Sequence, residues 1–220
     1  MIRVEAVSKY YEKEEAIRNV SFTIGKGEMA FLTGPSGAGK STLLKLLYLS
    51  EMPDAGVITV AGFRTSDLKE SSIPLLRRNI GVVFQDFKLL SNKTVYENIA
   101  LTLHIRGIPE KETKERVHSV LRLVNLRHKA DAFPLTLSGG EQQRITIARA
   151  IVGEPTVMLA DEPTGNLDFD NERGIMQIFK EINTKGTTIL IATHNKGLFT
   201  NTGRRVLFIE NGALLKEETG

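Results

Sequence analysis

The stretch that decides the fold is Gly34-Pro35-Ser36-Gly37-Ala38-Gly39-Lys40-Ser41, which follows the short apolar run Met29-Ala30-Phe31-Leu32. A glycine-rich loop between a buried strand and a helix matches the full pattern of a phosphate-binding loop. Its glycines allow backbone N–H groups to turn inward around phosphates, and the following helix points its positive end at the same place. Lys40 is expected to reach the β- and γ-phosphates, and the Ser41 hydroxyl to ligate Mg²⁺. We predict that this whole loop, together with Thr42, binds a nucleotide; a plain glycine-rich turn would not explain the Lys-Ser pair.

Two adjacent carboxylates, Asp161 and Glu162, follow a second apolar run at 157–160. Carboxylates at the end of a buried strand need a cation or a chemical task. In parallel α/β sheets ligands gather at the carboxyl ends of the strands, where the phosphate-binding loop also lies. We therefore expect Asp161 to hold the Mg²⁺ shell and Glu162 to polarise an attacking water molecule. A helix N-terminus would also favour acids here, but the pairing with the loop favours the catalytic role.

Alternating strand and helix patterns extend outward from these motifs. Four hydrophobic residues recur at helical spacing on one face between 86 and 137, where helical patterns replace the strands, namely Val117, Val120, Leu121 and Val124. Asn211-Gly212 between two apolar runs predicts a terminal hairpin. The patterns predict one α/β domain over 1–220, with a mostly parallel sheet, an N-terminal antiparallel β subdomain and a helical subdomain inserted at about 86–137. Its main strands are expected at 20–24, 29–32, 57–60, 80–84, 157–160 and 188–192.

The segment Leu137-Ser138-Gly139-Gly140-Glu141-Gln142-Gln143-Arg144 is the most specific motif. Ser138 and Glu141 at a spacing of three residues form a capping box at the start of a helix. Two glycines in a first helical turn each cost about 1 kcal/mol relative to alanine, and a plain cap does not need them. A cap whose backbone approaches a phosphate does need them. We therefore predict nucleotide contacts from Ser138, Gly139, Gly140 and Glu141.

Together these motifs resemble the ABC family of ATPases over essentially the whole chain, which implies ATP and Mg²⁺ as cofactors. The resemblance implies that Gln85 joins the Mg²⁺ shell and that His194 touches the γ-phosphate. It implies that Asp168, in Gly165-Asn166-Leu167-Asp168, contributes from a loop at a dimer interface. Tyr11 fits the position whose ring stacks on adenine, with Tyr10 as a near competitor. One departure is Asn195, where the family commonly has an acid; we expect little consequence.

The family mechanism needs two copies of the chain. The resemblance implies that ATP bound at Lys40 and Ser41 of one copy meets Ser138 to Gly140 of the other, so a homodimer sandwiches two ATP molecules. Hydrolysis then opens the sandwich, which makes a switch driven by the γ-phosphate. A monomer is expected to lack a complete site.

Composition excludes several other classes of protein. The 220 residues carry 29 Lys and Arg against 26 Asp and Glu, and the basic residues are scattered, so no nucleic-acid partner is expected. The chain has no cysteine, which excludes thiolate metal sites and cysteine nucleophiles. No run approaches the roughly 20 apolar residues of a membrane span, and the start Met1-Ile2-Arg3-Val4-Glu5 lacks the apolar core of a signal peptide. We expect a cytoplasmic protein, held at the inner face of the cell membrane by an integral membrane subunit.

Within the family the motifs are most similar to the bacterial cell-division ATPases, in particular around the phosphate-binding loop, at Val83-Phe84-Gln85-Asp86 and at Thr94-Val95-Tyr96-Glu97-Asn98. This resemblance implies a division membrane protein as partner and no transported substrate. The alternatives are the ATPase of a lipoprotein-release or macrolide-type exporter, and a soluble ABC protein acting on nucleic acid or ribosomes. In the family the segment after Gln85 lines a groove for a short helix of the membrane subunit, so Phe87 and Leu90 are predicted as apolar anchors.

Overall fold

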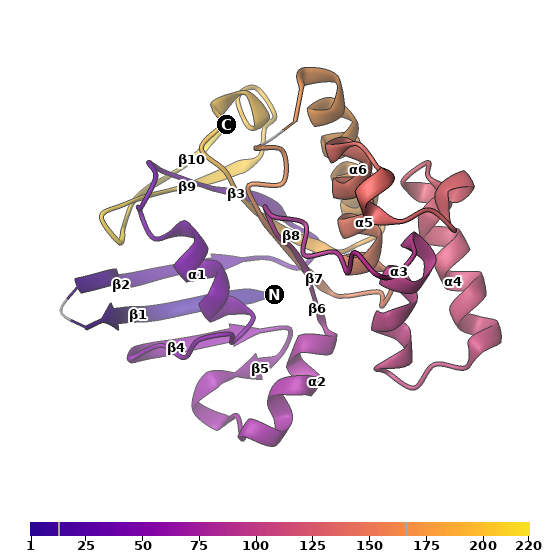
Figure 1. Cartoon of the computed structure of the whole chain (residues 1–220). Helices are drawn as coiled ribbons and strands as arrows, with labels where there is room; N and C mark the ends of the chain where they lie inside the picture. Colours follow the sequence, from indigo (N-terminus) through magenta and orange to yellow (C-terminus); the bar gives the residue numbers. More distant parts are fainter. Residues whose placement is uncertain (13, 166) are drawn as a thin grey trace.

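The computed structural model describes residues 1–12, 14–165 and 167–220 and contains two β-sheets with helices between and beside them (Figure 1). The larger sheet has the strand order β10-β9-β3-β8-β7-β6, in which only β10 runs antiparallel to its neighbour. Its strands are β3 (Met29–Thr33), β6 (Ile80–Val83), β7 (Val157–Asp161), β8 (Thr188–Ala192), β9 (Arg205–Glu210) and β10 (Ala213–Thr219). The smaller sheet, order β2-β1-β4-β5, is antiparallel and consists of β1 (Ile2–Tyr11), β2 (Glu14–Ile24), β4 (Ala55–Val60) and β5 (Phe63–Arg64).

The parallel sheet divides the interior into two hydrophobic cores. Side chains alternate between its faces, so Ala30 and Leu32 of β3 join one core while Met29 and Phe31 join the other. The first core also contains the antiparallel sheet and α1 (Lys40–Leu47). The second is covered by helices on the opposite side, as Figure 1 shows. They are α3 (Val95–His104), α4 (Glu110–Leu123), α5 (Gly139–Ile151) and α6 (Phe169–Thr184); α2 (Ile73–Arg78) lies below β6.

The predicted α/β class with its antiparallel arm is confirmed. The residues at 117 and 121 are buried in α4 as the helical spacing predicts. The segment 86–137 holds α3 and α4, which pack on α5 in the same core as β3, so its status as a separate subdomain stays a prediction. One detail differs: the leucines at 43, 44, 46, 47 and 49 predict a helix that includes Leu49, whereas α1 ends at Leu47 and Leu49 has a left-handed backbone with φ 54°.

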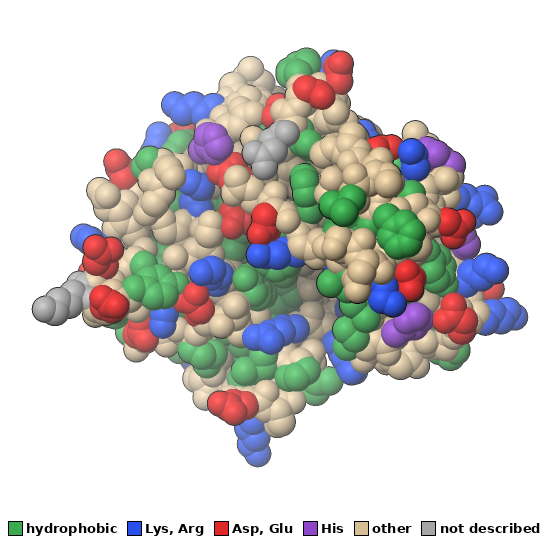
Figure 2. Space-filling view, viewed as in Figure 1, with side chains coloured by type: hydrophobic (Ala, Val, Ile, Leu, Met, Phe, Trp, Pro, Cys, Tyr) green, Lys and Arg blue, Asp and Glu red, His purple; other side chains and the backbone are tan. Residues whose placement is uncertain are grey.

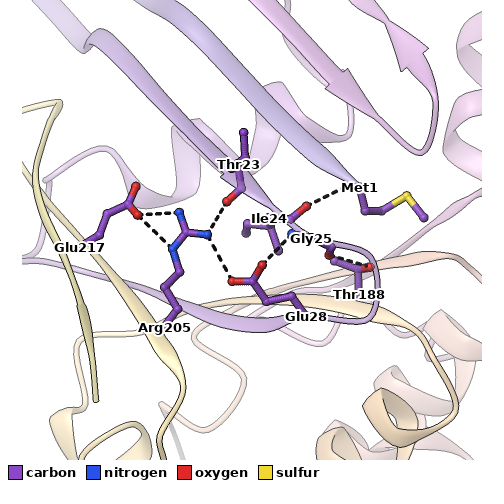
Figure 3. A network of polar contacts seen from close by, with 8 residues as sticks. All are labelled: Met1, Thr23, Ile24, Gly25, Glu28, Thr188, Arg205 and Glu217. Atoms are coloured by element: carbon purple, nitrogen blue, oxygen red, sulfur yellow. Dashed lines mark hydrogen bonds and ion pairs between the residues drawn. The ribbon is translucent and has the colours of Figure 1, made fainter.

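A polar network ties the two sheets to the terminal hairpin (Figure 3). Arg205 on β9 pairs with Glu217 of β10 and with Glu28, and it donates to the carbonyl of Thr23 at 2.6 Å. Glu28 in turn accepts from Gly25 N–H at 2.6 Å. One guanidinium therefore bridges β2, the start of β3 and β10.

Candidate active site

Four loops meet at the carboxyl ends of adjacent parallel strands and enclose a cleft of 680 Å³. They follow β3, β6, β7 and β8, as expected for a ligand site in a parallel sheet. Most of the predicted nucleotide residues line this one cleft: Tyr11, Pro35 to Thr42, Gln85, Asp161, Glu162 and His194. Residues up to 183 positions apart in the sequence thus reach one place, as Tyr11 and His194 show.

The phosphate-binding loop is shaped by close backbone contacts. A Cβ on Gly34 would lie 1.9 Å from the Ile209 carbonyl oxygen, and one on Gly39, at φ 102°, would lie 2.7 Å from the Ala16 carbonyl oxygen. Only glycine fits at both positions. Lys40, buried at the start of α1, donates from Nζ to the carbonyls of Gly34 at 2.8 Å and Pro35 at 3.0 Å. Its ammonium group therefore lies inside the loop, where phosphate oxygens would compete for it.

The terminal hairpin supports this loop, a contact that the sequence motifs do not reveal. Gly212, in the predicted Asn-Gly turn, donates its N–H to the Ala38 carbonyl at 3.1 Å. The Gly212 carbonyl accepts from Arg18 N–H of β2 at 2.8 Å. The loop is therefore held from both the hairpin and the antiparallel sheet.

Asp161 has the environment of a cation ligand. Burial raises the pKa of its carboxyl group, while the nearby Ser41 hydroxyl acts in the opposite direction. Its Oδ1 atom is buried and has no hydrogen-bond partner among the described residues. Gln85 lines the same cleft from the loop after β6. A hydroxyl, an amide and one carboxylate are hard oxygen donors, so the set fits Mg²⁺, which keeps several waters and takes few protein ligands.

Glu162 is held by the end of the neighbouring strand. Its Oε1 atom accepts from His194 N–H at 3.0 Å and lies 2.8 Å from His194 Nδ1, while Oε2 accepts from the Thr193 hydroxyl at 3.2 Å. Glu162 itself has a left-handed backbone with φ 45°. The predicted carboxylate and histidine are thus in direct contact. The position of Thr193, before the histidine at a strand end, is the only sequence signal for its part in the site.

The structure separates the two candidate adenine-stacking tyrosines. Tyr11 lines the cleft and its hydroxyl donates to Glu51. Tyr10 does not line the cleft, and its hydroxyl donates to Glu15 at 2.9 Å. The geometry therefore favours Tyr11.

The remaining predicted residues lie away from this cleft. Ser138 caps α5, its N–H donates to Glu141 Oε2 at 2.8 Å, and its hydroxyl accepts from Glu141 N–H, so the predicted capping box is present. Asp168 caps α6 and accepts from Asn171 N–H at 2.9 Å. Asn166, in the same predicted interface loop, lies outside the described residues.

In the motif at 137–144, which we call the signature, the second glycine (Gly140) has an explanation within the chain itself. A Cβ on Gly140 would lie 2.5 Å from the Asn171 side-chain oxygen, whereas one on Gly139 would meet nothing nearer than Leu167 at 3.8 Å. Asn171 also donates from Nδ2 to Asp168 at 2.9 Å. Gly140 thus allows α5 and α6 to begin side by side, while the nucleotide contacts predicted for the backbone of Gly139 and Gly140 stay predictions.

Comparison with known proteins gives a consistent assignment. The family described as ABC transporter matches residues 17–165. A protein of Streptococcus pneumoniae named cell division ATP-binding protein FtsE is 52% identical over 215 residues, 98% of this chain and 94% of that protein. Proteins of the same name are 48% identical over 220 residues in Bacillus subtilis and 50% identical over 215 residues in Escherichia coli. These cover 100% and 97% of this chain, and 96% and 97% of the respective relatives.

Solved structures agree with the fold. The dimeric structure of MJ0796, described as a bacterial ABC transporter cassette, has a TM-score of 0.91 and 34% identity, with 100% of this chain and 98% of that chain covered. A second dimeric structure of MJ0796, in a post-hydrolysis state bound to ADP and Pi, has a TM-score of 0.90 and 34% identity over the same shares.

Proposed function

The chain belongs to the ABC transporter family and is an ATP-binding and ATP-hydrolysing subunit of that type, and we propose that it serves bacterial cell division as a homodimer bound to the membrane protein FtsX. The observation that carries the ATPase site is the single cleft shared by the phosphate-binding loop, Asp161, Glu162 and His194. The name and identity of the relatives support the cell-division role.

The residues of the cleft have different roles in ATP hydrolysis. Lys40 and the loop N–H groups bind the β- and γ-phosphates, and Tyr11 stacks on the base. Ser41, Gln85 and Asp161 would hold Mg²⁺, which would neutralise charge on the phosphate oxygens. Glu162, oriented by Thr193 and His194, accepts hydrogen bonds on both carboxylate oxygens and so presents a fixed acceptor to an attacking water.

A second copy of the chain completes the site. Ser138 and Gly139 stand at the exposed start of α5 and do not line the cleft of their own chain. A helix N-terminus favours an anion, and the two dimeric MJ0796 structures support a paired arrangement. We propose that these groups, with Asp168, face the γ-phosphate held by the other copy.

The membrane partner docks in a groove beside Gln85. No helix in the described parts of the chain is long and apolar enough to cross a bilayer, so attachment at the inner face of the cell membrane would come from a partner. Figure 2 shows a hollow over β6, between α2 and α3, with hydrophobic side chains in it and Lys or Arg at its edge. This groove has a volume of 570 Å³ and includes Phe84, Lys88, Thr102 and Ile105.

The positive charge of the groove indicates which kind of partner helix it binds. Arg77, Arg78, Lys88, Arg106 and Arg149 line it, and no Asp or Glu is among its described lining residues. Three of these cations, Arg77, Arg106 and Arg149, bond to backbone carbonyls, which satisfy their donors without neutralising their charge. Lys88 instead forms an ion pair with Asp86 at 2.6 Å. We therefore propose that the occupant is a short amphipathic helix of FtsX that carries acidic residues beside apolar anchors.

We propose other anchor residues on this chain than those predicted from the sequence. Neither Phe87 nor Leu90, the predicted anchors, lines the groove; Phe87 is half-buried, and Leu90 instead donates its N–H to Asn98 at 2.8 Å. The apolar anchors in the groove are Phe84 and Ile105, of which Ile105 is 69% exposed at the end of α3. Phe84 and Ile105 are therefore our choice of anchors in place of Phe87 and Leu90, which a sequence pattern could not distinguish because it cannot show which face of an irregular segment points outward.

The test is recruitment to membranes that contain FtsX. Ile105→Asp should abolish co-purification with FtsX and leave ATP binding unchanged, because the side chain is exposed and outside the nucleotide cleft. Leu215→Asp is the matched control, since Leu215 is 61% exposed on β10 and does not line the groove. Unchanged recruitment of Ile105→Asp would refute the docking site, and co-purification of an exporter subunit in place of FtsX would refute the cell-division role.

A further inference from the structure

A hydrogen bond crosses from the first turns of α6 to the loop after β8. Asn195 donates from Nδ2 to Glu172 Oε2 at 2.7 Å, and both side chains are half-buried. The orientation of the Asn195 amide is fixed, because its Oδ1 atom accepts from Gly197 N–H at 2.9 Å and caps the short 3₁₀ helix at 196–198. The N–H group of the Asn195 amide therefore points at the Glu172 carboxylate.

On one side the bond continues to the catalytic carboxylate. Asn195 N–H donates to Thr193 Oγ1 at 3.1 Å, and the Thr193 hydroxyl donates to Glu162 Oε2 at 3.2 Å. His194, between them, holds the other carboxylate oxygen. A shift of Asn195 would move both groups that orient Glu162.

On the other side it continues to the start of α6. Glu172 N–H donates to the Asp168 carbonyl at 2.9 Å, in the helical turn that Asp168 caps. Asn171 lies between that cap and Gly140 of the signature. The first turn of α6 is thus in contact with the signature and, through Glu172, with the loop of His194.

We propose that Asn195 and Glu172 are a positioning pair that holds the Thr193–His194 loop, and through it Glu162, in register with the first turn of α6. The proposal rests on the catalytic role of Glu162 proposed above. It gives a reason for the departure at 195: an aspartate there would place two carboxylates in contact, and like charges at this distance repel.

The decisive experiment compares Asn195→Asp alone with Asn195→Asp combined with Glu172→Gln. Aspartate keeps the size of the side chain and the acceptor for Gly197 N–H, so the substitution acts at the contact with Glu172, where the hydrogen bond is replaced by repulsion between two carboxylates. We expect kcat for ATP to fall about tenfold while KM stays within about twofold, since the phosphate contacts are untouched. Glu172→Gln should restore kcat to within about twofold of the original, because the glutamine amide can donate to the introduced carboxylate.

Two further variants keep the test decisive. Asp170→Asn removes an exposed acid from the same turn of α6 and should leave kcat unchanged. Glu172→Ala should lower kcat severalfold, and melting curves should show each variant folded. An unchanged kcat in Asn195→Asp, a failure of Glu172→Gln to restore it, or a loss confined to KM overturns the positioning role. Near-normal turnover in Glu162→Gln would instead refute the catalytic assignment, so the two failures are distinguishable.

Discussion

Replacing each glycine of the signature by alanine should change stability in opposite directions. Gly139 and Gly140 are neighbours in the first turn of α5. A Cβ at 140 would lie 2.5 Å from Oδ1, 2.6 Å from Cγ and 3.1 Å from Nδ2 of Asn171, so that side chain must move. Moving it also breaks its 2.9 Å bond to Asp168 at the cap of α6. At 139 the nearest atom, on Leu167, is 3.8 Å away, which is an ordinary contact.

The magnitudes follow from two opposing terms. Alanine in place of glycine stabilises a helix by up to about 1 kcal/mol. Forcing a group into an occupied site costs about 1–3 kcal/mol. Gly139→Ala should therefore gain up to about 1 kcal/mol, and Gly140→Ala should lose about 1 kcal/mol, with the broken Asn171 bond adding to the loss. For a chain of this size 1 kcal/mol corresponds to about 2–4 °C in Tm, so the two variants should differ by about 4–8 °C.

The assay is urea unfolding with matched thermal melts of the nucleotide-free chain. Repeating Gly140→Ala in an Asn171→Ala background removes the clash, so the substitution there should cost nothing or stabilise. The reasoning is wrong if Gly140→Ala is as stable as Gly139→Ala in the original background. It is also wrong if the cost at 140 persists when Asn171 is absent.

Three other predictions concern catalysis and pH. Glu162→Gln should bind ATP and accumulate as an ATP-bound dimer, with hydrolysis slowed about 10²–10⁴-fold, measured as phosphate release and by size-exclusion chromatography. Ser138→Arg should bind ATP without hydrolysing it, and Lys40→Ala should not bind ATP. Mixing the two variants should restore some activity, because a mixed dimer contains one undamaged composite site. Mixed dimers that form but stay inactive would contradict this. The Ser138 N–H lowers the pKa of the Glu141 carboxyl below its usual range. The ionised Glu141 carboxylate therefore stabilises the folded chain above the unfolded pKa of about 4.3, and this stabilisation is lost as the pH falls through the folded pKa. Glu141→Gln should keep the capping box and remove this part of the acid sensitivity in urea unfolding at pH 7 and pH 3.

Sequence patterns predicted the elements that a continuous apolar run or a regular hydrophobic period marks. The runs at 157–160 and 188–192 became buried central strands, and the helix around Val117 has its predicted inner face. The patterns did not predict α2, whose six residues are too few to show a period. They extended the leucine-rich helix through Leu49, where the backbone reverses at φ 54°, because hydrophobic spacing does not reveal a left-handed residue.

Sequence patterns likewise predicted some residues of the candidate site and not others. Motifs predicted Lys40, Asp161 and Glu162, because each belongs to a local pattern with a fixed offset. Asn171 and Glu172 belong to no such pattern. Their importance comes from side chains on other elements that only the folded chain brings near, Gly140 for the first and Asn195 for the second. The order of strands in the sheet determines which elements lie next to each other, and no local sequence pattern predicts that order either.

Given the catalytic role proposed for Glu162, its left-handed backbone makes thermostability and activity compete at one position. A side chain at φ 45° costs of order 1–3 kcal/mol, and glycine would relieve most of it. Engineering or selection for heat resistance alone would therefore favour Glu162→Gly and discard the carboxylate that Thr193 and His194 hold. A library screened only for folding should be enriched in inactive members at this codon, whereas a screen for turnover should keep glutamate despite its cost.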